Sequence, residues 1–148
     1  MEHEAVLYEV VYASVVSLMM VLTTVTLHYW TLAGLSALLK RRKDFRGEIL
    51  LVVIAMFFAH MVEISLYAWV YQLLDRSDTY MSIGGAVDGS FIDHLYFSAA
   101  CYTSLGLGDL YPVGTLRLMA GVEALNGLIL ITWSASFAFL VMQRRWRF

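Results

Sequence analysis

Three long apolar stretches constrain this chain more than any other feature of its sequence. They run from about residue 8 to 30, from 49 to 74 and from 116 to 142. Each is long enough to cross a bilayer core, which takes about 20 apolar residues of helix. Only 15% of the 148 residues are charged, against about 25% in typical soluble domains. The sequence therefore predicts an all-α membrane protein with three transmembrane helices.

The remaining composition excludes several other classes of protein. The net charge of -2 gives no sign of nucleic-acid binding, and the single cysteine, Cys101, excludes an intrachain disulfide. The first residues are acidic where a signal peptide would be basic, so we expect all three stretches to belong to the mature protein.

A fourth apolar segment, over residues 91–103, is too short to cross the membrane. As a helix it extends only about 20 Å. Ser90 and Asp93 fit a helix N-cap and a carboxylate in the first turn. The pattern predicts a re-entrant helix over 91–103 that follows a loop over 75–90.

The basic residues predict which side of the membrane each end of the chain occupies. Eight of the ten follow the first or the third stretch: Lys40, Arg41, Arg42, Lys43, Arg46, Arg144, Arg145 and Arg147. The loop before the re-entrant helix is acidic instead, with Asp75, Asp78, Asp88 and Asp93. The positive-inside rule then places the N-terminus outside and the C-terminus in the cytoplasm, in a plasma (inner) membrane surrounded by lipid. We expect 144–148 to be a short cytoplasmic tail, with no large cytoplasmic regulatory domain on this chain.

The segment over residues 30–43 allows two interpretations. Leu32, Leu35, Leu38 and Leu39 form a helical stripe that ends in basic residues. It could prolong the first span, but we favour an interfacial helix lying on the inner membrane surface. Residues 1–47 would then comprise an extra N-terminal transmembrane helix and this interfacial helix or linker.

The segment after the re-entrant helix, residues 103–109, reads Thr-Ser-Leu-Gly-Leu-Gly-Asp. Non-helical backbone at membrane depth is tolerated only where it is buried in protein or lines a watery path. Glycine accepts positive φ, so the alternation of Gly106 and Gly108 with larger residues can turn successive carbonyls to one side. If several copies of the chain surround one axis, these carbonyl oxygens could replace the hydration shell of a monovalent cation. The negative end of the re-entrant helix dipole and Asp109 would attract that cation.

The string TSLGLGD resembles the TTVGYGD signature of potassium channels, and GDLYPV resembles the continuation in small two-helix bacterial channels. GLGD is also similar to the second filter of some two-pore-domain potassium channels. The resemblance covers roughly 49–142. It implies a potassium-channel-like pore domain over 48–143, with outer helix 49–74, extracellular loop 75–90, pore helix 91–103, filter 104–108 and inner helix 116–142.

The resemblance also implies roles for individual residues and a partner for the chain. Each chain has one filter and the family's pore needs four, so a homotetramer is implied. K⁺ would be bound in the filter, with no other cofactor. The implied metal contacts are Ser104, Leu105, Gly106 and Leu107, and Thr103, Gly108 and Asp109 complete the filter. Gly127 would be the inner-helix hinge, and Leu128, Ile131 and Ala135 would line the cavity.

Several filter positions depart from the family's commonest pattern. Ser104 replaces threonine, Leu105 replaces valine and Leu107 replaces a tyrosine whose hydroxyl is tied to pore-helix aromatics. Tyr96 and Phe97 occupy those aromatic positions, but Leu107 offers them only apolar contact. Ala100 replaces the glutamate that usually partners Asp109. We therefore expect fewer lateral hydrogen bonds, and a weakly selective monovalent cation channel remains an alternative.

The sequence is also compatible with two functions outside the channel class. Gly106 to Asp109 matches the GxGD motif of intramembrane aspartyl proteases, but that chemistry needs a second membrane-embedded aspartate. The other intramembrane acids are Glu63 and Glu123, and three spans are too few, so we expect no enzyme. A non-conducting membrane subunit is the third class.

Ionisable and polar residues inside the predicted spans suggest a second site. His60 and Glu63 lie one helical turn apart, and Glu123 reaches a similar depth from the other side. We predict that these three form a proton-sensing cluster, with a static hydrogen-bonded clip as the plainer account. His28, beside Tyr29 and Trp30, is interpreted as part of an aromatic belt. Asn126 either bonds a neighbouring helix or faces the cavity.

Overall fold

The structure is a computed structural model that describes residues 2–41, 47–77, 81–86 and 88–146. Its elements in chain order are α1 (Glu2–Arg41), α2 (Glu48–Ser77), β1 (Ile83–Gly85), α3 (Phe91–Tyr102), β2 (Leu110–Pro112) and α4 (Leu116–Trp146). Helices α1, α2 and α4 are each long and apolar enough to cross a membrane, which confirms the three predicted spans.

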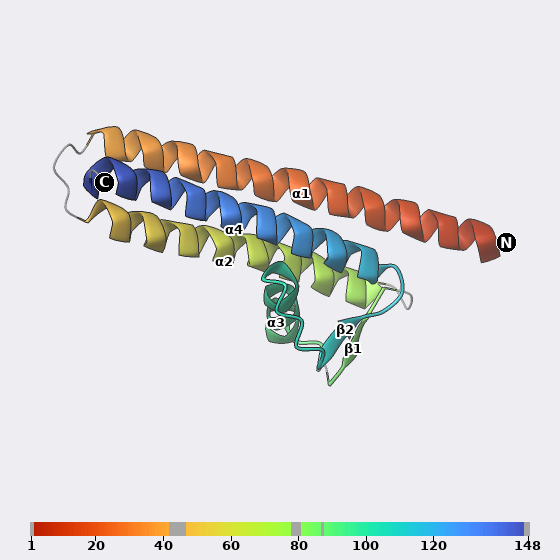
Figure 1. Cartoon of the computed structure of the whole chain (residues 1–148). Helices are drawn as coiled ribbons and strands as arrows, with labels where there is room; N and C mark the ends of the chain where they lie inside the picture. The colour runs from red at the N-terminus through yellow and green to blue at the C-terminus, as the bar shows by residue number, and fades with distance from the viewer. Residues whose placement is uncertain (1, 42–46, 78–80, 87, 147–148) are drawn as a thin grey trace.

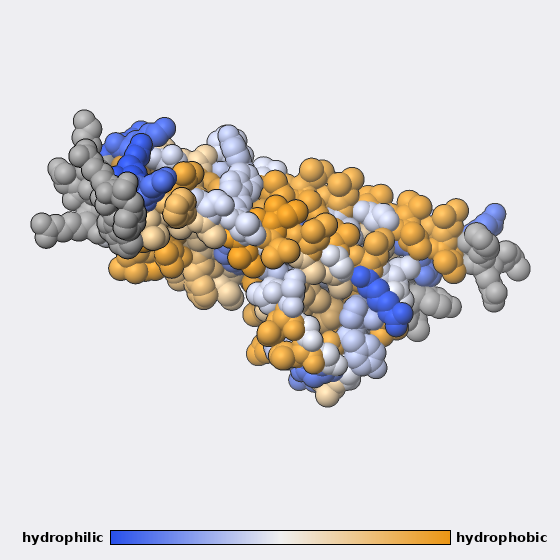
Figure 2. All heavy atoms as spheres, in the orientation of Figure 1, coloured by the Kyte–Doolittle hydropathy of each residue, from blue (hydrophilic) through white to orange (hydrophobic). Residues whose placement is uncertain are grey.

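The three long helices lie side by side, with α4 between α1 and α2 (Figure 1). The end of α1, the start of α2 and the end of α4 meet at one end of the bundle, which places Lys40, Arg41 and Arg144 together (Figure 1). Apolar side chains cover much of the face shown in Figure 2, and hydrophilic ones gather at its left end and on or beside the part that projects below the bundle. The other basic residues between α1 and α2, which are Arg42, Lys43 and Arg46, lie outside the described residues, as does Arg147.

Helix α1 continues without a break to Arg41, so the preferred prediction of an interfacial helix over 30–43 is wrong. Leu32 and Leu35 are buried in a cluster with Val52 and Met56 of α2. The leucine stripe therefore packs against other helices of the same chain. This packing prolongs the first span, which was the alternative interpretation.

Helix α3 begins as its capping residues predict and ends at Tyr102, one residue before the predicted boundary. The Ser90 hydroxyl accepts a hydrogen bond from the backbone N–H of Asp93 at 3.3 Å. The ring of Phe97 packs edge-on against Tyr71 of α2, with 5.0 Å between ring centroids. Helix α3 packs against α2 and α4, in the half of the bundle away from the basic end (Figure 1).

A two-stranded antiparallel sheet, which the sequence did not predict, occupies part of the expected loop and the exit of the filter segment. Gly84 of β1 pairs with Tyr111 of β2. Asp75, near the end of α2, joins this sheet to α3: one carboxylate oxygen accepts from the Ile83 N–H at 3.1 Å, and the other lies 3.2 Å from His94 Nε2. Asp75 therefore has a structural role in addition to its predicted contribution to an acidic loop. Asp78 lies outside the described residues.

Helix α1 is joined to α4 by buried polar contacts. The Asn126 side-chain amide donates to Thr24 of α1 at 2.8 Å and to the Tyr67 hydroxyl of α2 at 3.3 Å. Asn126 is buried. Of its two possible roles, the structure supports the bond to a neighbouring helix.

Candidate ion-conducting site

The predicted filter segment starts directly after α3 and is held to the end of that helix. The N–H of Leu105 donates to the Ala100 carbonyl at 2.9 Å, and the N–H of Ser104 donates to the Cys101 carbonyl at 2.9 Å. The hydroxyl of Thr103 donates back to the Ala99 carbonyl at 2.7 Å. The two backbone bonds use carbonyls of Ala100 and Cys101 in the last turn of α3, which would otherwise lack helical partners.

The backbone of this segment alternates between left-handed and ordinary conformations. Ser104, Gly106 and Gly108 have φ of 56°, 55° and 84°, whereas Leu105 and Leu107 are not in the positive-φ region. The prediction that Gly106 and Gly108 take positive φ is confirmed. Ser104 was not predicted to join them, and for a non-glycine residue this conformation costs roughly 1–2 kcal/mol. Such strain persists only where the surroundings impose it, often at functional sites.

Residues predicted to contact the ion through their backbone carbonyls, or to line the cavity, are exposed on the single chain. Leu105 and Leu107 of the filter segment are 62% and 60% exposed, and Leu128 of α4 is 56% exposed. Ile131 and Ala135, further along α4, are exposed as well. The surface that a multi-chain pore would use is thus free in one chain.

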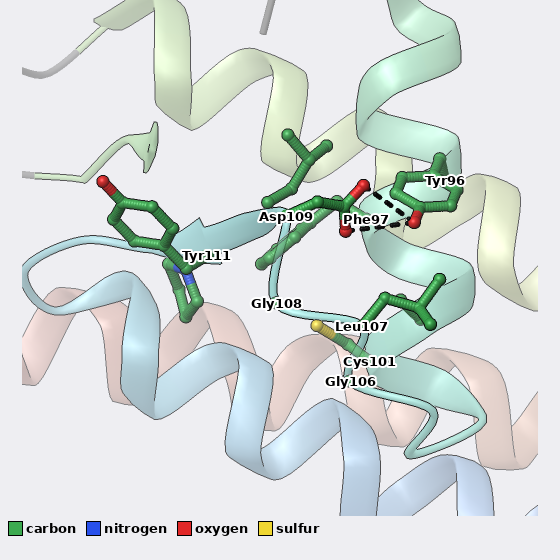
Figure 3. A pocket seen from close by; sticks show the side chains of 11 residues that line it. Tyr96, Phe97, Cys101, Gly106, Leu107, Gly108, Asp109 and Tyr111 are labelled. Atoms are coloured by element: carbon green, nitrogen blue, oxygen red, sulfur yellow. Dashed lines mark hydrogen bonds between the residues drawn. The ribbon is translucent and has the colours of Figure 1, made fainter. Parts of the chain in front are cut away.

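Behind the filter segment, a hollow of about 210 Å³ separates it from α3 (Figure 3). Phe97, Cys101 and Leu107 are among its lining residues. As the sequence predicts, Leu107 brings no polar group to this hollow.

Asp109 has a partner that the sequence analysis did not provide. The Tyr96 hydroxyl of α3 donates to the two carboxylate oxygens of Asp109 at 3.0 and 2.9 Å (Figure 3). This hydrogen bond raises the pKa of Tyr96 and keeps its phenol protonated as the donor. The expectation of few lateral bonds at the filter is therefore wrong at Asp109, because Tyr96 replaces the missing acidic partner at Ala100.

Changing Tyr96 to phenylalanine should weaken the outer end of the filter segment. The variant keeps the ring but removes both bonds to Asp109, so the carboxylate is free to turn away. We expect the K⁺/Na⁺ permeability ratio to fall several-fold while the protein still folds. Bi-ionic reversal potentials measure this ratio. Tyr111→Phe, on the opposite wall of the same hollow, is the control and should leave it unchanged; equal effects of both changes would contradict a specific role for the Tyr96–Asp109 bond.

The three residues of the predicted proton-sensing cluster do not form one group. His60 and Glu63 meet, with His60 Nδ1 3.1 Å from the Glu63 carboxylate. Glu123 instead accepts hydrogen bonds from Tyr71 at 2.5 Å and from Ser98 at 2.6 Å. Glu123 therefore binds α3 at Ser98. Glu63 binds α3 one helical turn later, where it accepts from the Tyr102 hydroxyl. The predicted cluster is therefore wrong in its inclusion of Glu123.

His28 lies in an environment that its sequence context did not predict. It is fully buried, and its Nδ1 lies 2.9 Å from the Glu63 carboxylate. It does not belong to an exposed aromatic belt. The sequence signal that could have indicated this is a histidine inside an apolar span, since such groups usually pair with other buried polar residues.

Gly127 lies at the closest approach between α4 and the end of α3. It is buried, and a Cβ added there would overlap the carbonyl oxygen of Tyr102. This contact gives Gly127 a packing role. Its predicted role as a hinge stays a prediction.

Comparison with known proteins agrees with this arrangement. A family model described as an ion channel matches residues 50–144, which include most of α2, all of α3 and the filter segment, and most of α4. No curated protein and no solved structure matches the chain. The family indicates a channel role, not an enzymatic one, which argues against the intramembrane protease. The chain is a multi-pass membrane protein and belongs to the ion-channel family of two-helix pore domains typical of potassium channels.

Proposed function

We propose that this chain is the subunit of a potassium-selective channel. The observation that carries the proposal is the alternation of positive φ at Ser104, Gly106 and Gly108, directly after a capped half-length helix. Because this backbone lies within the residues matched by the ion-channel family, we infer that its carbonyls replace the hydration shell of K⁺. The carbonyls of Ser104, Leu105, Gly106 and Leu107 would contact the ion, between Thr103 at the inner end and Gly108 and Asp109 at the outer end.

Four copies of the chain would complete the pore. One chain presents one filter segment, and its outward-facing surface at Leu105, Leu107 and Leu128 is exposed. Leu128, Ile131 and Ala135 would line a cavity below the filter. The proposal needs no cofactor other than K⁺.

The proposed orientation places the basic end of the bundle in the cytoplasm and α3 in the outer half of a plasma membrane. Lys40, Arg41 and Arg144 lie at the end of the bundle away from α3, which supports this orientation under the positive-inside rule. Ions would leave past Asp109.

The test is reversal-potential measurement with the purified protein in planar bilayers, with K⁺ on one side and Na⁺ on the other. We expect a K⁺ preference of at least about tenfold, which displaces the reversal potential by about 59 mV for a monovalent ion. Protein-free bilayers are the control. Equal permeability to K⁺ and Na⁺ would contradict the proposed selectivity.

A weakly selective cation channel is the second candidate, and the apolar contact of Leu107 with the hollow is the observation that favours it. The Tyr96–Asp109 bonds oppose it, because they hold the filter exit laterally. Conduction with equal K⁺ and Na⁺ permeability would select this candidate. Absence of any conduction would instead favour a non-conducting subunit.

A further inference from the structure

A second polar site lies inside the bundle, away from the filter carbonyls. It is centred on Glu63 and takes one or more side chains from each of the four helices: His28 from α1, His60 and Glu63 from α2, Tyr102 from α3 and Ser134 from α4. We call these five residues the Glu63 cluster. All are buried except His60, whose side chain is 17% exposed.

On one side of the two histidines, their Nδ1 atoms converge on the Glu63 carboxylate. His28 Nδ1 lies 2.9 Å from one carboxylate oxygen, and His60 Nδ1 lies 3.1 Å from the other. The Tyr102 hydroxyl is 2.9 Å from His60 Nδ1 and 2.5 Å from Glu63. The ligand atoms that His28, His60 and Glu63 can offer lie within 4.8 Å of one another.

On the other side, the two Nε2 atoms converge on a single hydroxyl. Ser134 Oγ is 3.2 Å from His28 Nε2 and 3.0 Å from His60 Nε2. Its own proton points to the Met56 sulfur at 3.3 Å. A hydroxyl that donates its proton elsewhere has two lone pairs left, so it can accept from both Nε2–H groups. That arrangement leaves the lone pairs of both Nδ1 atoms directed at Glu63.

The arrangement with both protons on Nδ1 leaves a polar atom without a partner. If each neutral ring carries its proton on Nδ1, both Nε2 atoms become acceptors. The Ser134 hydroxyl has one proton and can donate to only one of them. The other Nε2 would be a buried acceptor without a donor, which is costly. With one proton on His28 Nδ1 and the other on His60 Nε2, Glu63, Ser134 and Tyr102 can satisfy both rings without a cation. With both protons on Nε2, the Nδ1 lone pairs and the Glu63 carboxylate are together available to a cation.

We propose that His28 Nδ1, His60 Nδ1 and the Glu63 carboxylate bind a divalent transition-metal ion of the zinc class, with the Tyr102 hydroxyl in reach as a fourth ligand. Zinc takes four nitrogen, oxygen or sulfur ligands in a tetrahedron at about 2.0–2.2 Å, which places neighbouring ligand atoms about 3.3 Å apart. The separations of 2.9 and 3.1 Å between nitrogen and oxygen are close to this spacing. Imidazole with carboxylate suits zinc better than calcium or magnesium, which prefer oxygen ligands alone.

Ser134 completes the site from outside the ligand set. A histidine that binds a metal through one ring nitrogen almost always donates a hydrogen bond from the other, which fixes its tautomer and orientation. Ser134 accepts from both rings at once, so it would orient both ligands. The partly exposed edge of His60 is the side from which an ion can reach the cluster.

The position of this site gives it a role in addition to ion conduction. Its ligands belong to α1, α2 and the last residue of α3, immediately before Thr103. A bound ion would join the N-terminal helix to the base of the filter segment. Because metal binding is measured without current, its failure and the failure of the proposed channel function are distinguishable.

The test uses the purified full-length chain in detergent with Co²⁺ as the probe, since tetrahedral Co²⁺ with nitrogen and oxygen ligands absorbs strongly in the visible range. We expect one Co²⁺ per chain, displaced by Zn²⁺. His28→Gln and His60→Gln remove a ligand and should each lower the affinity at least about 100-fold. Ser134→Ala should lower it about 10–100-fold, the usual effect of losing a partner of a metal ligand.

Two variants provide matched controls. His94→Gln changes a buried histidine that is paired with Asp75 near the start of α3, and Ser136→Ala changes an exposed serine on α4 that donates to the Thr132 carbonyl. Both should bind Co²⁺ like the parent. An absent or octahedral Co²⁺ spectrum in the parent, or equal affinities in Ser134→Ala and Ser136→Ala, would overturn the proposal. Thermal melting identifies folded variants, and Ser134→Ala decides the outcome if the histidine variants do not fold.

Discussion

Replacement of Gly106 by alanine is expected to abolish potassium-selective conduction. Gly106 has φ of 55°, a conformation that costs an L residue roughly 1–2 kcal/mol, and the proposed tetramer would carry the change four times. Among the described residues, apart from Gly106 and its two chain neighbours, no heavy atom lies within 4 Å of an added Cβ, so the expected effect comes from the backbone and not from a clash. Relief of the strain rotates the neighbouring peptide and turns its carbonyl away from the ion path. K⁺ flux from liposomes and bi-ionic reversal potentials measure the loss.

Gly121→Ala is the matched control for this change. Gly121 lies in α4, has open space around an added Cβ, and does not have positive φ. Alanine favours a helix over glycine by about 1 kcal/mol, so this variant should keep its flux and fold at least as well as the parent. If Gly106→Ala retained the K⁺/Na⁺ ratio of the parent, carbonyl coordination by this segment would be untenable.

Gly127→Ala should destabilise the folded protein and disturb the filter together. The added Cβ would overlap the Tyr102 carbonyl oxygen and lie 2.9 Å from the Tyr102 ring. Backbone at the end of α3 cannot yield without moving Thr103, so we expect a loss of about 1–3 kcal/mol in the free energy of unfolding, the usual cost of overpacking. Thermal unfolding followed by tryptophan fluorescence measures the stability, and K⁺ flux measures the function.

The same variant separates packing from hinge bending at Gly127. If the glycine served only as a hinge, alanine would leave the unfolding temperature unchanged and alter only the open probability. Gly121→Ala again serves as the control, because it adds the same methyl group to the same helix without a close neighbour. An unchanged unfolding temperature in Gly127→Ala would contradict the packing role.

The elements that the sequence predicted correctly are those determined by local properties. Span length follows from hydropathy, the start of α3 from the side chains of Ser90 and Asp93, and positive φ from the glycines at 106 and 108. Each depends on residues that are neighbours along the chain. Propensity, capping and backbone sterics act at that range, so the features they determine can be predicted from the sequence alone.

The features that escaped prediction depend on how helices rotate about their axes. His28 and Glu63 are 35 residues apart, and their contact requires that α1 and α2 turn the right faces towards each other. The stripe at Leu32 and Leu35 is compatible with a membrane surface or with a helix partner, and only the position of Val52 decides between them. Tyr96 and Asp109 meet because the chain reverses direction after α3. Apolar spans carry little periodic signal for rotation, because nearly every face is apolar.

The bond between His28 and Glu63 has a consequence for the order in which the protein is made. Helices α1 and α2 leave the ribosome before α3 and α4, and a lone carboxylate is costly in the interior of a bilayer. Because the histidines next to Glu63 are on α1 and α2, the two early helices can insert as a hairpin in which the Glu63 carboxylate already lies beside polar side chains. Tyr102 of α3 and Ser134 of α4 then pack against polar residues that α1 and α2 have already brought together. The N-terminal helix would in this way act as an internal chaperone for the membrane insertion of the pore segment.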